Sequence, residues 1–130
     1  MMKAAGLDLA MAMAYEAIAM SSGTSFVHET ESQLILSGSR DVNFTMDLVQ
    51  KDIGLFQKIA DDYGVPLEVS PIVIDIMSDR QKRFGDCAQS DRIIERLEKA
   101  TGLSILAAGF PENLVDDQPE KIGYEVTLRR

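Results

Sequence analysis

The stretch from residue 44 to residue 60 most constrains the fold, because its apolar residues recur at helical spacing along the whole segment. At about 100° per residue, one apolar stripe forms and a second group widens it to roughly half of the helix circumference. The stripe consists of Met46, Val49, Ile53, Phe56 and Ala60, and the second group of Phe44, Leu48, Leu55 and Ile59. Such a wide stripe predicts a helix that packs against other helices.

Two charged residues interrupt this apolar arc. Asp52 projects into its middle, between Leu48 and Phe56, and Lys51 lies at its edge. A carboxylate at an apolar surface is costly unless it has a partner. Asp47 precedes Lys51 by four residues, so an ordinary helix ion pair is one explanation for Lys51. That pair leaves Asp52 without the lysine, and we therefore interpret Lys51 and Asp52 as the best candidates for a functional pair.

Helical periodicity continues through most of the chain. Clusters of Gly, Ser and Pro divide it into helices expected at about 1–20, 26–36, 45–63, 71–84 and 91–99. Asn43 or Thr45 is the candidate N-cap of the third helix, and Ser90 that of the fifth. The pattern predicts an all-α fold, a bundle of five or six helices that forms one domain over residues 1–102.

Residues 103–130 differ in character and are expected to form a C-terminal extension. Residues 103–110 are apolar, residues 111–121 are rich in Pro and acidic residues, and residues 123–129 alternate as in a strand. A single strand has no ladder partner. The extension is expected to pack on the helices, to pair with a second chain or to fray.

The composition excludes several classes of function. The formal net charge of −8 argues against a nucleic-acid partner, because phosphate binding needs clustered Lys and Arg. No apolar run reaches the roughly 20 residues of a membrane span. An apolar stretch at 9–20 is interrupted by Glu16 and is not typical of a signal peptide. These observations predict a cytoplasmic protein with neither a nucleic-acid nor a membrane partner.

Motifs for chemistry are scarce. Cys87 is the one cysteine, which fits a reducing compartment, and His28 is the one histidine, far from it in sequence. We therefore do not favour a Cys/His dyad. The sequence contains no Gly-rich dinucleotide or phosphate loop, no zinc-binding pattern and no Gly-x-Ser-x-Gly. We assign no catalytic residue and no metal ligand.

The order of the landmarks along the chain is nevertheless familiar. They are Gly6-Leu7-Asp8, Ser22-Gly23-Thr24-Ser25, Phe44-x6-Lys51-Asp52-Ile53-Gly54-Leu55, Gly64-Val65-Pro66-Leu67 and Phe84-Gly85-Asp86 followed by Ser90. Over residues 5 to 101 this order resembles the C-terminal helical domain of the β-hydroxyacid dehydrogenases. That family includes 3-hydroxyisobutyrate dehydrogenase and tartronate semialdehyde reductase, and its helical domain is of the 6-phosphogluconate dehydrogenase C-terminal type.

The resemblance implies a two-part enzyme. In the family, an N-terminal Rossmann domain binds NAD or NADP, and the helical domain closes the active-site cleft and builds the dimer. Carried over to this chain, Lys51 is expected to contact the cofactor near its nicotinamide-ribose end. Asp52 is expected to order that contact and the substrate pocket, and Phe44 to line the pocket wall.

Departures from the family pattern limit the expected activity. The sequence lacks the Rossmann half and the segment with the family's catalytic lysine, and Ala88 stands where an acidic residue is usual. We therefore expect a stand-alone or truncated domain that binds no cofactor alone, but NAD or NADP once a separate Rossmann-domain chain is supplied. The expected partners are a second copy in a homodimer and a small hydroxyacid. The alternative is a free-standing homodimeric helical interaction module without redox activity.

Overall fold

The computed structural model describes residues 1–6, 11–114 and 123. Every named secondary-structure element in this part of the chain is a helix. The elements in order are α1 (Met11–Ala19), α2 (Phe26–Ser37), α3 (Met46–Asp62), α4 (Ser70–Phe84), the 3-10 helix η1 (Ser90–Ile94) and α5 (Glu95–Thr101). The all-α fold class is thereby confirmed. Among the helices described, none has the length and apolar character needed to cross a membrane.

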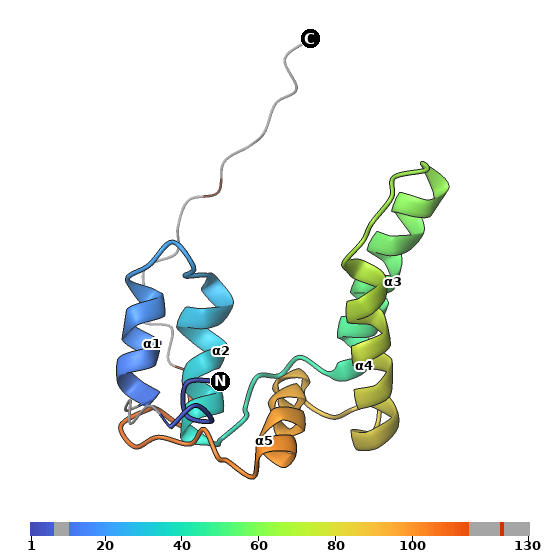
Figure 1. Ribbon diagram of the computed structural model, residues 1–130. Helices are drawn as coiled ribbons and strands as arrows, with labels where there is room; N and C mark the ends of the chain where they lie inside the picture. The colour runs from blue at the N-terminus through green and yellow to red at the C-terminus, as the bar shows by residue number, and fades with distance from the viewer. Residues whose placement is uncertain (7–10, 115–122, 124–130) are drawn as a thin grey trace.

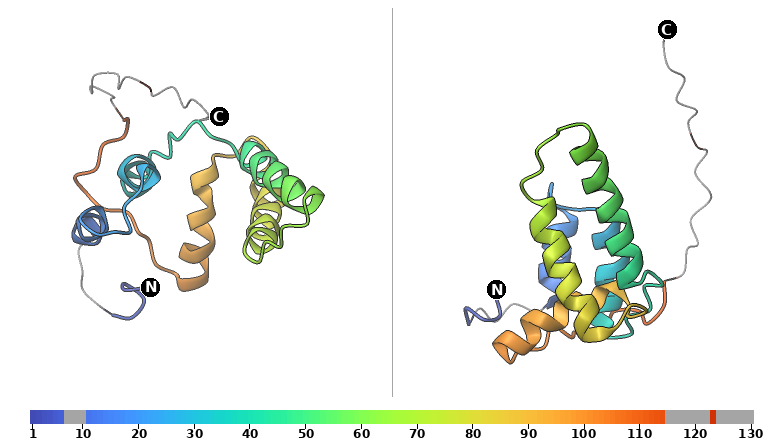
Figure 2. Two further views of the ribbon diagram at one scale, coloured as in Figure 1. Left: turned by 90° about the horizontal axis from the view of Figure 1, so that it is seen from above. Right: turned by 90° about the vertical axis from the view of Figure 1, so that its right-hand side faces the viewer.

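The helices form two hairpins that stand apart (Figure 1). Helices α1 and α2 form the first hairpin, and α3 and α4 form the second, more extensively packed one. Helix α5 lies between the two hairpins at the end opposite their turns, as the view from above also shows (Figure 2). The position of one hairpin relative to the other therefore depends on η1, α5 and the connection between α2 and α3.

Sequence signals at the helix ends explain α2, α3 and α4. The Ser25 side chain caps α2 by accepting a hydrogen bond from the backbone of His28 (3.1 Å), and Gly38 ends the helix in the left-handed conformation, with φ at 87°. Thr45 is the N-cap residue of α3, and Pro71 lies in the first turn of α4. The predicted boundaries of these three helices agree with the structure within two residues.

The first and last helices differ from the prediction. Residues 1–6 form turns rather than helix, and Gly6 has a φ of 76°, which a continuous right-handed helix does not permit. The fifth helix starts as the 3-10 helix η1 before it widens into α5. Ser90 is the first residue of η1 instead of its N-cap, and Gln89 takes the cap position.

The described part of the extension packs against the helices. The backbone of Ala107 donates to the Leu36 carbonyl (2.9 Å), and the ammonium group of Lys3 donates to the Ser104 carbonyl. The Phe110 ring meets Tyr15 edge-on, with 5.3 Å between the ring centroids. Packing was one of the three expectations for this segment. The strand predicted at 123–129 lies outside the described residues except for Gly123.

Much apolar surface remains uncovered. Within the described residues, the buried apolar side chains are Ala14, Leu34, Leu36, Met46 and Ala60. Along the predicted stripe of α3, Met46 and Ala60 are buried, whereas Phe56 is 62% exposed. The stripe thus meets α4 over only part of its width, and its outer part is open.

Two glycines give a paired test of this backbone. Gly38 has a φ of 87°, and a Cβ there would lie 3.0 Å from a methyl group of Leu106, whereas a Cβ at Gly54 inside α3 would meet nothing within 4 Å. We expect Gly38→Ala to lower the free energy of unfolding by about 1–2 kcal/mol. Gly54→Ala should raise it by about 0.5–1 kcal/mol because alanine favours helix. Urea unfolding followed by far-UV circular dichroism measures both, and a stabilising Gly38→Ala would contradict the left-handed cap.

Candidate functional site

The start of α3 is held by a short antiparallel pairing with the segment that precedes η1. The backbone of Met46 donates to the Ala88 carbonyl (2.8 Å), and the backbone of Ser90 donates to the Phe44 carbonyl (2.8 Å). An isolated bridge joins Thr45 to the same segment. These bonds fix the backbone of Phe44 and the direction in which α3 leaves, so they determine where the charged residues of α3 lie.

Lys51 and Asp52 form an ion pair on the surface of α3. The lysine Nζ lies 3.0 Å from Oδ1 of Asp52, and the two side chains are 59% and 54% exposed. The expected structural alternative, a pair between Asp47 and Lys51, is not the contact observed. A hydrogen bond from the Thr45 side chain is the main cause that lowers the pKa of Asp47, and Lys51 adds a smaller effect. Lys51 and Asp52 are thus paired with each other, and the functional role of the pair stays a prediction.

Asp52 also borders an open groove of about 460 Å³ between α3 and α4. The groove is lined by Asp52, Ile53, Phe56, Val69, Ser70 and Val73. Its walls are apolar, and the Ser70 hydroxyl oxygen is buried without a protein hydrogen-bond partner. An apolar groove with a carboxylate at its rim suits a small ligand with few polar groups.

The structure thus brings together two of the three predicted site residues. Phe44 lies before the first residue of α3 and does not line the groove, whereas Asp52 does, with Lys51 as its ion-pair partner. Its place in a substrate pocket stays a prediction. The sequence analysis did not select Ser70. The signal for it was its position between Val69 and Val73, two apolar residues four apart that share one face of a helix.

The remaining candidates have structural explanations. His28 lies in α2, where its Nε2 is 3.0 Å from the Tyr15 carbonyl and its Nδ1 is 3.4 Å from the Ser32 hydroxyl. Its ring also stacks on that of Tyr15, with 4.6 Å between centroids. Cys87 is exposed, in the segment before η1. No group of His, Cys, Asp and Glu within the described residues could hold a metal ion.

The exposure of the Lys51–Asp52 pair leads to a prediction about stability. Surface ion pairs contribute about 0–1 kcal/mol, since water solvates both charges in the folded and the unfolded protein. We expect Lys51→Met and Asp52→Asn each to change the free energy of unfolding by less than about 1 kcal/mol. Chemical denaturation of the two variants and the parent checks this. A larger loss in either variant would show that the pair serves stability.

The comparisons with known proteins agree with this description. A family model described as "NAD-binding of NADP-dependent 3-hydroxyisobutyrate dehydrogenase" matches residues 1–97. No curated protein matches the chain significantly. The matched region contains both hairpins, the Lys51–Asp52 pair and η1. The chain therefore belongs to the family of the NAD-binding region of NADP-dependent 3-hydroxyisobutyrate dehydrogenase.

Proposed function

We propose that this chain is the helical, C-terminal-type part of an NAD(P)-dependent 3-hydroxyacid dehydrogenase and contributes the substrate side of its cleft. The observation that carries the proposal is the solvent-accessible Lys51–Asp52 pair at the rim of an apolar groove, in a chain that belongs to this family. A surface ion pair alone would not support this function. The pair supports it here because Lys51 and Asp52 belong to a motif that resembles the family's and lie beside a groove of small-ligand size.

The residues present fit contact with a dinucleotide and a hydroxyacid. Lys51 keeps ammonium hydrogens available for a ribose hydroxyl or a phosphate oxygen, and Asp52 accepts a hydrogen bond from a ribose hydroxyl. Ser70 lines the groove, but its hydroxyl oxygen is buried, so it could meet a substrate carboxylate only after its side chain rotates. NAD(P) would supply the hydride in such an enzyme. The chain itself would bind, orient the reactants and exclude water.

The chain is not competent on its own in this proposal. Hydride transfer needs a cofactor held in register with a general acid. The sequence contains no Gly-rich phosphate-binding loop, and no catalytic lysine is assigned in it. A nucleotide-binding domain must therefore be supplied, either elsewhere on the same polypeptide or on a separate chain.

Ligand binding can be tested by thermal unfolding of the chain mixed with a Rossmann-domain chain of the family, in the presence of NADPH, of NADH and of each dinucleotide plus a small 3-hydroxyacid. We expect a stabilisation of about 1 kcal/mol or more at roughly ten times Kd. Lys51→Met should abolish most of that shift. Lys58→Met is the matched control, because Lys58 also lies on α3, is exposed and pairs with an aspartate, Asp62. The absence of a shift with every dinucleotide would favour the alternative function.

That alternative is a homodimeric helical interaction module, and a specific observation supports it. Large apolar side chains, each more than half exposed, gather on the second hairpin. They are Leu55, Phe56, Ile59, Tyr63, Val65, Val69 and Ile72. Exposed apolar surface of this kind marks association sites, so we propose a homodimer for either function.

Sedimentation equilibrium at micromolar concentration tests the dimer. We expect a mass twice that of the 14.3 kDa chain. Ile59→Lys should weaken association at least tenfold, which corresponds to about 1.4 kcal/mol, because it places a charge in the apolar contact. Val27→Lys is the control, since Val27 is similarly exposed but lies on α2. A parent protein of monomeric mass would contradict the dimer.

A further inference from the structure

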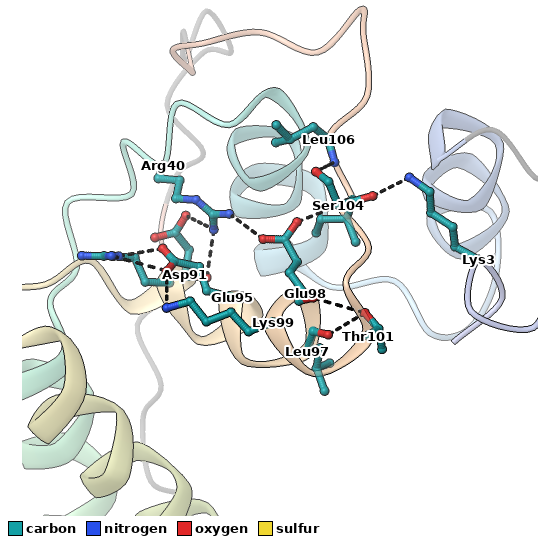
Figure 3. A network of polar contacts seen from close by, with 12 residues as sticks. Lys3, Arg40, Asp91, Glu95, Leu97, Glu98, Lys99, Thr101, Ser104 and Leu106 are labelled. Atoms are coloured by element: carbon teal, nitrogen blue, oxygen red, sulfur yellow. Dashed lines mark hydrogen bonds and ion pairs between the residues drawn. The ribbon is translucent and has the colours of Figure 1, made fainter.

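A buried polar junction joins the two hairpins at Arg40, in the connection between α2 and α3 (Figure 3). Its Nη1 lies 3.6 Å from Oδ2 of Asp91 and donates to the Asp91 carbonyl (3.4 Å). Its Nη2 lies 3.5 Å from Oε2 of Glu98 in α5. The other carboxylate oxygen of Glu98 accepts a hydrogen bond from the backbone of Ile105 (2.8 Å). Arg40 thus connects the end of the first hairpin to η1, to α5 and, through Glu98, to the following segment.

Asp91 is the least compensated charge in this junction. Its side chain is 0% exposed, and neither carboxylate oxygen has a hydrogen bond of good geometry, although nearby backbone N–H groups favour its ionised form weakly. The one ion pair, at 3.6 Å, is too long for a strong charge-assisted hydrogen bond. Removing an ionised carboxylate from water is costly, and a single distant partner offsets that cost only in part. Burial raises the pKa of Asp91, and Arg40 together with the backbone N–H groups of Asp91 and Arg92 opposes that rise without cancelling it.

The other charged groups around the junction compensate Asp91 only weakly. The hydrogen bond to Glu95 is the largest cause that raises the pKa of Arg92, and the charge of Asp91 is the smallest. Glu31 of α2 lies close to Asp91. Burial is the main cause that raises the pKa of Glu31, and the negative charge of Asp91 raises it further. Arg92 of η1 donates to Glu95 of α5 (2.8 Å), and Lys99 lies 3.7 Å from the same Glu95. Both cations also lie over the Phe84 ring. Arg40 is therefore the one cation of this group that is paired with Asp91.

We propose that Asp91 and Arg40 form a pH-sensitive junction between the hairpins, which tightens when Asp91 is protonated and loosens when it is ionised. If the junction opens, water reaches the carboxylate and its ordinary acidity returns. The closed junction therefore binds the proton more tightly than the open one. By linkage, falling pH favours the closed arrangement, and rising pH through the titration of Asp91 favours the open one.

The junction is connected to the candidate site through the backbone. Asp91 directly follows Ser90, whose N–H donates to the Phe44 carbonyl beside the start of α3. Movement of η1 away from Arg40 therefore pulls on the pairing that fixes the direction of α3. The orientation of the second hairpin, which carries Lys51 and Asp52, then follows the protonation of Asp91.

Spin-label distance measurements between the hairpin turns test the proposal. Labels at Met20→Cys and Glu68→Cys, in a Cys87→Ser background, report the separation, because Met20 and Glu68 are both exposed and lie in the two hairpin turns. Labelled protein is diluted with unlabelled protein so that only distances within one chain contribute. Carboxyl carbon NMR follows the titration of Asp91 in the same samples. We expect the distance distribution to narrow as the pH falls through the titration of Asp91.

Four variants make the result decisive. Asp91→Asn should give a narrow distribution at every pH, whereas Asp61→Asn, an exposed carboxylate on α3, should behave like the parent. Arg40→Gln should move the transition to higher pH, because it removes the cation that favours ionised Asp91. Glu31→Gln should move it to lower pH, because it removes a repelling charge. The proposal is overturned if Asp91→Asn retains the pH dependence of the parent, or if Asp91 titrates without any change in the distances.

Discussion

The arrangement of the second hairpin depends on how the first turn of α3 satisfies its backbone N–H groups. The N-cap residue Thr45 makes no side-chain hydrogen bond to those groups. Carbonyls from the segment before η1 replace it, since Met46 donates to Ala88 and Asp47 donates to Asp86 (3.3 Å). Unpaired N–H groups at a helix start are costly when buried, and Met46 is fully buried. The solution to a local capping problem therefore fixes a long-range contact, and it places α3 against the element that carries Asp91.

The sequence predicts well those features that neighbouring residues determine. Ser25 and Gly38 delimit α2 because a hydroxyl cap and a left-handed glycine act within one turn of the helix. The first helix was predicted to include residues 1–6 because the helical periodicity extends back to Met1. Gly6 adopts a left-handed conformation, which interrupts a helix. The 3-10 start of the fifth helix was missed for a different reason. Its geometry depends on the pairing with residues 44–46, which no pattern in residues 90–99 records.

The candidate site shows the same division. Lys51 and Asp52 could be selected from sequence because two charges in an apolar arc are a local anomaly. The structure changes the physical argument, since the two side chains compensate each other at the surface and neither is deeply buried. Their location at a groove, rather than a cost of burial, now supports a function. Asp91 could not be selected, because its burial and its partner Arg40 come from a segment 51 residues away.

The uncovered apolar face and the candidate site are parts of one surface. Phe56 and Val69 are exposed and also line the groove that Asp52 borders. Any helix layer that covers this face would therefore also close the groove and remove water from the Lys51–Asp52 pair. Electrostatic interactions strengthen as the local dielectric constant falls, so a pair worth little at the open surface would hold a ligand more firmly once covered. Association through this face and ligand binding at the pair should then be coupled, because both depend on the same covered surface.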